Sequence, residues 1–385
     1  SLYHILILSN APTPSNDALF ATLARLPGVL LKVIYCALRE SHRLWALQQS
    51  KGYDFDVASG YTVGSTHFNP GIGRHITGFN PDVVVLTGSY AMPTFVLAVR
   101  TLRTHAIPWV YWGEELSFAR KSFLPAIVRG RLRAILKQAA SIFAIGSRAV
   151  ESYARLGISR DRIVDFRYYA DVDSFRLTES RAQNARSTLR ERWGISPAAP
   201  LFLFCGQLIP RKGVDVLLDA AALVMTQTPS VHVVLVGAGE QELELRRQAQ
   251  SLGIAASVHF TGFVQPGELP EYFAAADALV LPSHQEGWGL VVAEALAAGL
   301  PVLASERVNS AVDLVTDGEC GYRFRAGDAA HLAEAMRALI ATLARPDVMR
   351  DNARATGERE SPQRAAQRMV TLLADAAAPG GARNG

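Results

Sequence analysis

The sequence contains little cysteine. Its three cysteines, Cys36, Cys205 and Cys320, lie far apart in the 385 residues. None has the short spacing to another cysteine or to histidine that a metal or redox motif requires, so no cysteine-based metal or redox site is predicted. The simplest interpretation is a protein that works in a reducing, cytoplasmic setting.

Long hydrophobic runs are also missing. No apolar run reaches the roughly 18–20 residues that a helix needs to cross a bilayer. The sequence enters a strand-like run at residues 5–8 without a basic leader or a small-residue cleavage site. We therefore expect neither a membrane-spanning helix nor a signal peptide.

Charge of either sign is modest. The composition is 19% charged and 49% hydrophobic, as in globular proteins, and the formal net charge is +4. This slight basic excess comes without any motif for nucleic acid, so we expect no nucleic-acid partner. Anionic small molecules or an anionic membrane surface fit the charge equally well.

Short apolar runs alternate with helical segments in both halves of the chain, and this alternation predicts parallel sheets with helices on both faces. Residues 39–79 interrupt the pattern and are interpreted as irregular structure with one short helix. The first helix is expected to begin near its predicted caps, Asn16 or Asp17. The predicted strands are at residues 5–8, 30–36, 82–86, 109–112, 141–145, 201–205, 231–236, 258–260, 278–281 and 302–305.

The pattern stops in a charged passage at residues 171–200 and then restarts, which predicts two doubly wound domains. We place them at residues 1–180 and 181–361, with a last amphipathic helix at about 362–376. Two such domains form a cleft between the carboxyl ends of their strands, where ligands of open α/β sheets bind. Polar and glycine-bearing loops follow the strands at these ends.

The chain is most informative at residues 281–305, where a strand, a glycine-bearing loop, a helix and another strand follow in order. The glycine-bearing entry leaves the first N–H groups of the helix open, so its start can seat a phosphate. Glu286 in the loop and Glu294 inside the helix flank that position. Two carboxylates around an anion fit a nucleoside-diphosphate-sugar, with Glu294 on ribose hydroxyls. An ordinary loop with two solvated glutamates explains the spacing as well.

Two further loops belong to the same predicted edge. Arg211 and Lys212 precede a helix and could hold a diphosphate, although a solvated basic loop is the alternative. The run Val236-Gly-Ala-Gly-Glu240 has half of a dinucleotide-binding fingerprint, and because its third glycine is missing it is better explained as a tight turn.

In the first half, Glu114 and Glu115 follow the strand at 109–112. They could serve as a general base or as a clamp on an acceptor hydroxyl. Acidic residues at the start of a helix are the alternative, since they favour the helix dipole.

Residues 118–137 carry six positive charges and no negative ones, interleaved with apolar residues. Such a segment could lie on an anionic membrane and hold the protein at the inner face. A solvated outer helix face is the other interpretation. The histidines show no spacing typical of a metal site, so none is predicted.

Five segments together resemble the retaining glycosyltransferases of family 4, which have the GT-B fold of two Rossmann-like domains facing across a cleft. They are the 206–213 loop, the Val236-Gly-Ala-Gly-Glu240 turn, Phe260-Thr-Gly-Phe263, Ala276-Asp-Ala-Leu-Val-Leu-Pro-Ser283, and Glu286 with Glu294, which have seven residues between them. The likeness is strong over about residues 200–340 and weaker in the first half.

The resemblance implies a donor sugar nucleotide, such as a UDP- or GDP-sugar, on the second domain and an acceptor on the first. It implies no metal and no other cofactor, because basic side chains and helix N–H groups neutralise the leaving diphosphate. The last helix would return to the first domain. The implied site residues are Glu286 for the donor sugar, Lys212 and Arg211 for the diphosphate, Gly289 and Leu290 for the distal phosphate, Glu294 for the ribose, Phe263 and Val264 near the base, and Gln207 and Gly237 in the flanking loops.

Three departures from the family pattern concern the phosphate and acceptor contacts. Gln207 stands where many members have arginine, residues 10–16 replace a glycine-rich loop, and Glu114 and Glu115 stand where many members have histidine. The resulting expectation is a retaining hexosyltransferase of glycan, glycolipid or glycosylated-metabolite biosynthesis. The alternatives are a sugar-nucleotide epimerase on the same fold and a non-catalytic subunit that binds sugar nucleotides.

Overall fold

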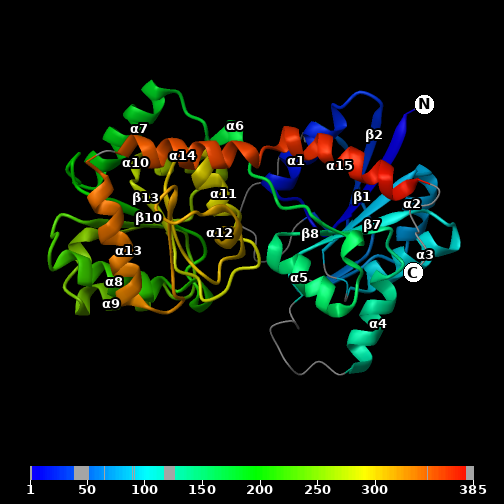
Figure 1. Ribbon diagram of the computed structural model, residues 1–385, viewed down its shortest axis with the longest axis horizontal. Coiled ribbons are helices and arrows are strands. Elements are labelled where there is room, and N and C mark those ends of the chain that lie inside the picture. Colours follow the sequence, from blue (N-terminus) through cyan, green and yellow to red (C-terminus); the bar gives the residue numbers. More distant parts are fainter. Residues whose placement is uncertain are drawn as a thin grey trace. The chain divides into compact units, whose positions relative to one another are not determined.

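The computed structural model describes residues 2–38, 52–64, 66–88, 90, 92–116, 126–344 and 346–378. The chain divides into two compact units, Ser1–Tyr169 with Pro362–Gly385, and Ala170–Ser361. Each is an α/β unit with one main parallel sheet (Figure 1). The division lies earlier than the sequence suggested, because the helices that follow Tyr169 pack on the second unit.

The first unit has a seven-stranded sheet in the order β3-β2-β1-β6-β7-β8-β9, and all of its pairs are parallel. Its central strands are apolar along their whole length because helices cover both faces. The strands are β1 (Tyr3–Ser9), β2 (Val29–Tyr35), β3 (Asp54–Val57), β6 (Val83–Thr87), β7 (Trp109–Gly113), β8 (Ser141–Ala144) and β9 (Ile163–Asp165).

The helices of the first unit include one from the far end of the chain. Helix α15 (Pro362–Ala377) packs against α1 (Pro14–Ala24) and contacts β7, so residues more than three hundred positions apart lie side by side (Figure 1). Its apolar face is buried through Ala366, Met369 and Leu373. The other helices are α2 (Ile72–Phe79), α3 (Pro93–Thr104), α4 (Ala126–Leu136) and α5 (Ser147–Leu156).

Two expectations for the first unit were wrong. Helix α1 begins at Pro14, and its cap is Thr13, whose hydroxyl accepts from the Asn16 N–H at 3.3 Å. Proline fits the first helical position, so the helix starts earlier than Asn16 or Asp17. The part of 39–79 at residues 39–51 lies outside the described residues. The described part contains the predicted short helix, α2, but also β3 and a hairpin of β4 (Tyr61–Val63) and β5 (Thr66–Phe68), where irregular structure was expected.

The second unit has a six-stranded parallel sheet in the order β12-β11-β10-β13-β14-β15. The chain moves outward from β10 to β12, returns to the centre at β13, and moves outward on the other side. Ligands of open α/β sheets bind where the strand order reverses in this way, here between β10 and β13. The strands are β10 (Leu201–Cys205), β11 (His232–Val236), β12 (Val258–Gly262), β13 (Ala278–Leu281), β14 (Val302–Ser305) and β15 (Gly321–Phe324).

Helices of the second unit form two groups, which right-handed crossovers place on opposite faces of the sheet. In one group α8 (Val214–Met225) contacts α9 (Glu242–Ser251) and α13 (Ala329–Thr342). The other group contains α6 (Val172–Phe175), α7 (Glu179–Arg192), α10 (Leu269–Ala275), α11 (Leu290–Ala297), α12 (Asn309–Leu314) and α14 (Pro346–Arg359). Helix α14 lies along α11 in Figure 1.

A buried charge cluster ties α7 to this unit. The Asp277 carboxylate, just before β13, accepts from Arg190 at 2.8 Å and from Arg186 at 2.7 Å. It also accepts from the Leu201 N–H at the start of β10. Arg190 is fully buried and donates to the backbone carbonyls of Ala275 and of the segment before β10. The passage expected to link the domains therefore belongs to the second unit.

Candidate functional site

The candidate site lies at the carboxyl ends of β10 and β13, where the strand order of the second unit reverses. β10 pairs directly with β13, so the loops that follow these two strands are neighbours. The first loop carries Arg211 and Lys212, and the second carries Glu286. The structure thus brings Glu286 next to Lys212, which is 74 positions earlier in the sequence, and next to Arg211.

The first loop ends in a short 3-10 helix, Pro210–Lys212, followed by Gly213 in the left-handed conformation with φ of 63°. A Cβ at Gly213 would lie 2.4 Å from the Pro282 carbonyl oxygen, so glycine permits the close approach of the two loops. The His284 N–H donates to the Arg211 carbonyl at 2.9 Å and fixes the loops together.

The Glu286 carboxylate forms ion pairs with both cations of the first loop. One oxygen pairs with the Lys212 ammonium and the other lies 3.3 Å from the Arg211 guanidinium. The Ser283 hydroxyl lies 3.5 Å from the carboxylate. The Glu286 N–H donates to the Arg307 carbonyl at 3.1 Å, which anchors the loop beside β14. The side chains of Lys212 and Glu286 are only 12% and 13% exposed, so this pair is largely removed from water.

Helix α11 begins directly after this loop. Its first residue is Leu290, and the preceding Gly289 has φ of 87° and caps the helix without any side-chain hydrogen bond. A Cβ at Gly289 would lie 3.0 Å from Glu286 Cγ and 3.0 Å from a methyl carbon of Val308. The glycine therefore lets the Glu286 side chain pass close to the helix start, which is the favourable end of the helix dipole for an anion.

Glu294 lies in α11, one turn further into the helix. Its carboxylate has no hydrogen-bond or ion-pair partner among the residues that the structure describes. Burial raises the pKa of Glu294 to about 7, because removal from water disfavours the charged form. A carboxyl group held without a partner in a partly closed position is ready to accept hydrogen bonds from hydroxyl groups of a ligand.

Cys205 is a neighbour of this carboxyl group that the sequence did not single out. Burial raises the pKa of its thiol to about 12, with Glu294 adding to the rise and Lys212 opposing it. The thiol is therefore protonated at neutral pH. Its position as the last residue of β10 is the sequence feature from which Cys205 could have been predicted to lie near the site.

The remaining predicted donor residues line neighbouring strand ends. Gly237 follows β11 with φ of 140°, and a Cβ there would lie 1.8 Å from the Gly206 carbonyl, so it is a close-approach glycine. Phe263 and Val264 follow β12, where Phe263 is 40% exposed and Val264 is nearly buried. Gln207 is exposed after β10. An exposed aromatic ring at this edge can stack on a nucleotide base.

Glu114 and Glu115 lie in the first unit, directly after β7. The Glu114 carbonyl accepts from the Tyr153 hydroxyl at 2.8 Å. Whether a helix follows them lies outside the described residues. The strand order of the first unit reverses between β1 and β6. There Asn10 packs against Gly88, whose carbonyl accepts from Tyr111.

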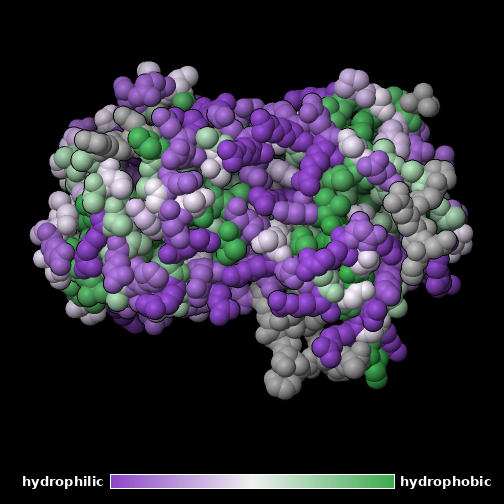
Figure 2. Space-filling view, in the orientation of Figure 1, coloured by the Kyte–Doolittle hydropathy of each residue, from purple (hydrophilic) through white to green (hydrophobic). Residues whose placement is uncertain are grey.

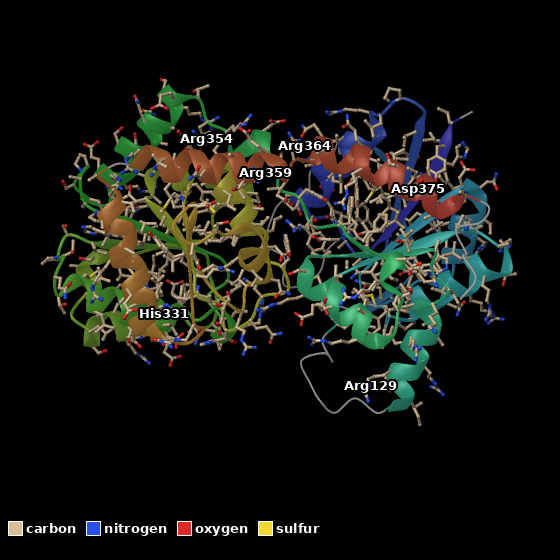
Figure 3. All side chains as sticks on the ribbon, viewed as in Figure 1. Arg129, His331, Arg354, Arg359, Arg364 and Asp375 are labelled. Carbon is tan, nitrogen blue, oxygen red and sulfur yellow. The ribbon has the colours of Figure 1, made fainter. Side chains whose placement is uncertain are left out.

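The basic segment is described from Ala126 onward, and the part at 118–125 lies outside the described residues. Helix α4 exposes Ile127 and Val128, which are 70% and 42% exposed, beside Arg129, Arg131 and Arg133. Figure 2 shows apolar next to polar surface at the tip of this helix, and Figure 3 shows Arg129 near its amino-terminal end. No helix in the described parts of the chain is long and apolar enough to cross a membrane.

Histidines and acidic residues do not gather into a metal site in the described part of the chain: no group of three or more metal-ligating side chains is found there. His232 and His259 stack on each other, with ring centroids 5.4 Å apart, near the amino ends of β11 and β12. This places them at the opposite edge of the sheet from Glu286, as structural residues.

The match to a known protein family lies within the second unit. Residues 185–356 match the family model of glycosyl transferases group 1. A D-inositol 3-phosphate glycosyltransferase of Geodermatophilus obscurus is 38% identical over 165 residues, which is 40% of this chain and 36% of that protein. A GDP-mannose-dependent alpha-(1-6)-phosphatidylinositol monomannoside mannosyltransferase of Mycolicibacterium smegmatis is 36% identical over 36% of this chain and 37% of its own length. The matches thus span well under half of these relatives.

Solved structures match over almost the whole chain. The crystal structure of Anabaena Alr3699/HepE in complex with UDP has a TM-score of 0.78 at 21% identity, covering 97% of this chain and 100% of that one. WaaG, a glycosyltransferase involved in lipopolysaccharide biosynthesis, has a TM-score of 0.67 at 19% identity, covering 96% and 99%. At these identities the likeness concerns the fold. Residues 185–356 therefore match the glycosyl transferases group 1 family, and the two Rossmann-like units have the GT-B fold of these solved structures.

Proposed function

We propose that this protein transfers a sugar from a nucleoside-diphosphate-sugar to an acceptor hydroxyl, with retention of the anomeric configuration and without a metal ion. One observation carries the proposal. Two cations, Lys212 and Arg211, and two carboxylates, Glu286 and Glu294, gather around the start of α11, at the reversal point of the sheet. This is the set of charges that a diphosphate between two hydroxyl-bearing sugars requires.

Each group has a role in the proposed complex. Lys212 and Arg211 bind the diphosphate, and the N–H groups at Gly289 and Leu290 seat its distal phosphate. Glu294 accepts from the ribose hydroxyls, and Phe263 lies near the base. Glu286 accepts from hydroxyls of the donor sugar. Positive charge beside the leaving diphosphate stabilises the charge that develops there, which is the function that a metal ion serves elsewhere.

In the proposed reaction the bond between the anomeric carbon and the diphosphate oxygen breaks while the acceptor oxygen bonds to the same face of that carbon. The acceptor hydroxyl proton passes to the leaving diphosphate oxygen. Glu114 and Glu115 are the candidates in the first unit for binding the acceptor hydroxyl. The products are a glycoside of unchanged anomeric configuration and a nucleoside diphosphate.

The relatives suggest which substrates to test first. One is named for inositol 3-phosphate and another for GDP-mannose and a phosphatidylinositol mannoside, and a fold neighbour is solved with UDP. A thermal-shift panel of UDP-glucose, GDP-mannose and ADP-glucose finds the donor, because a tight ligand raises the melting temperature by mass action. Activity assays with inositol phosphates and glycolipid acceptors follow, with and without EDTA. A rate that EDTA abolishes, or an inverted product, would contradict the proposal.

Two variants test the site assignment. Lys212→Ala removes charge from the leaving group, and Glu286→Ala removes the contact that positions the sugar. Each is expected to lower turnover by orders of magnitude, while the circular dichroism spectrum and cooperative melting stay those of a folded protein. Near-normal turnover in both variants would refute the assignment.

An epimerase and a silent binding subunit are distinguished by product analysis. An epimerase converts the sugar nucleotide without any acceptor, whereas the proposed transferase needs one to form a glycoside. Tight donor binding without turnover across a wide acceptor panel would favour the silent subunit. The presence of Lys212, Glu286 and Glu294 together favours an active enzyme.

We further propose that α4 holds the protein at the inner, anionic face of a membrane, where a glycolipid acceptor would lie. The support is the exposed Ile127 and Val128 beside Arg129, Arg131 and Arg133, since apolar side chains next to cations suit an anionic lipid surface. Co-sedimentation with vesicles containing 30 mol% anionic lipid (a test composition) is expected to fall for an Arg129→Glu, Arg131→Glu variant. Binding that does not depend on anionic lipid would refute this placement.

A further inference from the structure

The Lys212 and Glu286 side chains, which the proposed function assigns to different parts of the donor, bind each other in this structure. Lys212 pairs with one carboxylate oxygen of Glu286, and Arg211 lies 3.3 Å from the other. A diphosphate that binds these two cations must therefore take them from Glu286. The carboxylate is an anion that already belongs to the site.

Because Lys212 and Glu286 are largely buried, separating them has a large effect on free energy. Lys212 and Glu286 are about seven-eighths buried, whereas Arg211 is 46% exposed. Exposed ion pairs contribute little because water and salt screen them, but a largely buried charge that loses its partner is strongly destabilised. The contact between Lys212 and Glu286 is thus the one that matters, and neither group can be left unpaired without cost.

The surroundings of Glu286 also suit a phosphate. Its side chain passes 3.0 Å from where a Cβ at Gly289 would be, beside the start of α11. Helix starts and flanking cations are the surroundings that phosphate prefers. The carboxylate thus pairs with Lys212 close to the start of α11, in surroundings that would also suit a phosphate.

We propose that Glu286 is an internal counter-anion of Lys212 that a sugar nucleotide displaces and that pairs with Lys212 again once the diphosphate product has dissociated. This inference rests on the proposed function and concerns how the site distinguishes its donor from its spent product. When an intact sugar nucleotide binds, the diphosphate takes Lys212, and the donor sugar offers hydroxyls to the displaced Glu286. When only the nucleoside diphosphate binds, Lys212 gains a partner but Glu286 loses its own and gains none.

The exchange has a measurable consequence of opposite sign for the two ligands. Glu286 opposes binding of a nucleoside diphosphate, because that ligand takes Lys212 away and leaves the carboxylate without a partner. It supports binding of the sugar nucleotide, because the sugar hydroxyls give the carboxylate a new partner. A neutral side chain at position 286 should therefore tighten product binding and weaken donor binding. A residue that merely contacts the sugar would leave product binding unchanged.

The test is isothermal titration calorimetry of the full chain at pH 8 with UDP, GDP and ADP, and with UDP-glucose, GDP-mannose and ADP-glucose. Glu286→Gln keeps the shape of the side chain and removes its charge. We expect the Kd of the best-bound diphosphate to fall about tenfold and the Kd of the matching sugar nucleotide to rise. Glu240→Gln is the matched control, because Glu240 is an exposed carboxylate after β11 at the same edge of the sheet. It should change neither Kd.

The outcomes separate this inference from the proposed function. If the wild-type chain binds none of the six nucleotides, the proposed function fails. If it binds them and Lys212→Ala loses the diphosphate, but Glu286→Gln binds it no more tightly, the counter-anion inference alone is overturned. Glu286→Asp provides a second variant in case Glu286→Gln does not fold. Its shorter carboxylate withdraws from Lys212, so diphosphate binding should tighten less than with glutamine but measurably, and an unchanged Kd would count against the inference.

Discussion

Glu294→Gln is the substitution that best tests the proposed role of Glu294 in binding the nucleoside part of the donor. The wild-type carboxyl group has its pKa raised from its usual 4.5 to about 7 by burial alone. For a carboxyl group with a raised pKa, the protonated form favours folding. Its contribution is fully present below pH 4.5 and is lost as the pH rises through 7. Glutamine has nearly the same shape and does not ionise, so it should abolish this dependence.

The magnitude follows from the pKa. At about 1.36 kcal/mol for each pKa unit, the ionised Glu294 costs the ligand-free protein about 3 kcal/mol of unfolding free energy at pH 8. Glu294→Gln is therefore expected to be more stable than wild type at pH 8, and equal to it at pH 4.5. A gain from removing a charge within a binding site is the expected sign when that charge has no partner in the empty state.

Binding should depend on pH in the opposite sense. A ribose that donates to the carboxylate favours its ionised form, so donor affinity rises with pH. Ionising a group with a pKa of about 7 gives roughly a tenfold gain in donor affinity between pH 6 and pH 8. Calorimetry with an intact sugar nucleotide measures this without interference from a terminal phosphate that titrates nearby. If wild type and Glu294→Gln show the same pH dependence, or if the variant is less stable at pH 8, the reasoning is refuted.

Two further predictions concern the stability of the second unit. Asp277→Asn leaves the fully buried Arg190 without its carboxylate, so urea denaturation should show a loss of about 3–5 kcal/mol, and a loss under 1 kcal/mol would show that the cluster is dispensable. Burial lowers the pKa of both His232 and His259, so folding favours their neutral forms, and stability should fall as the pH drops below 6.5. For the His259→Gln variant, the melting temperature should fall less than that of wild type as the pH drops below 6.5. If the two proteins show the same pH profile, groups other than His259 cause the loss of stability.

The sequence predicted the part of the site that depends on strand order. Alternating strands and helices imply a parallel sheet, and residues that follow neighbouring strands must meet at one edge. That reasoning placed Lys212 and Glu286 on the same edge although 74 residues separate them. Gly289 before a helix was predicted for the same local reason, because a helix that starts without a side-chain cap has open N–H groups.

Contacts that depend on side-chain packing were not predicted. Arg190 reads in the sequence as one more charge on a polar helix, and only the fold shows that it is buried against Asp277. The hairpin of β4 and β5 was missed because two strands of three residues carry too little alternation to identify. The Thr13 cap was missed because a proline at the next position moves the helix start, and the sequence offered two other capping residues further on.

The pairing of Lys212 with Glu286 shows a further limit of reading a site from its motif. A motif assigns each residue to a part of the bound ligand, and so it describes the occupied state. In the empty state the same residues must satisfy one another, since a largely buried charge without a partner is costly. Glu286 meets this requirement through Lys212, whereas Glu294 meets it through a pKa raised to about 7, which lets part of the population be neutral near neutral pH. Donor binding must separate Glu286 from Lys212 and ionise Glu294. Affinity for the donor is therefore set by the difference between the contacts made with the donor and those made without it, and not by the bound contacts alone.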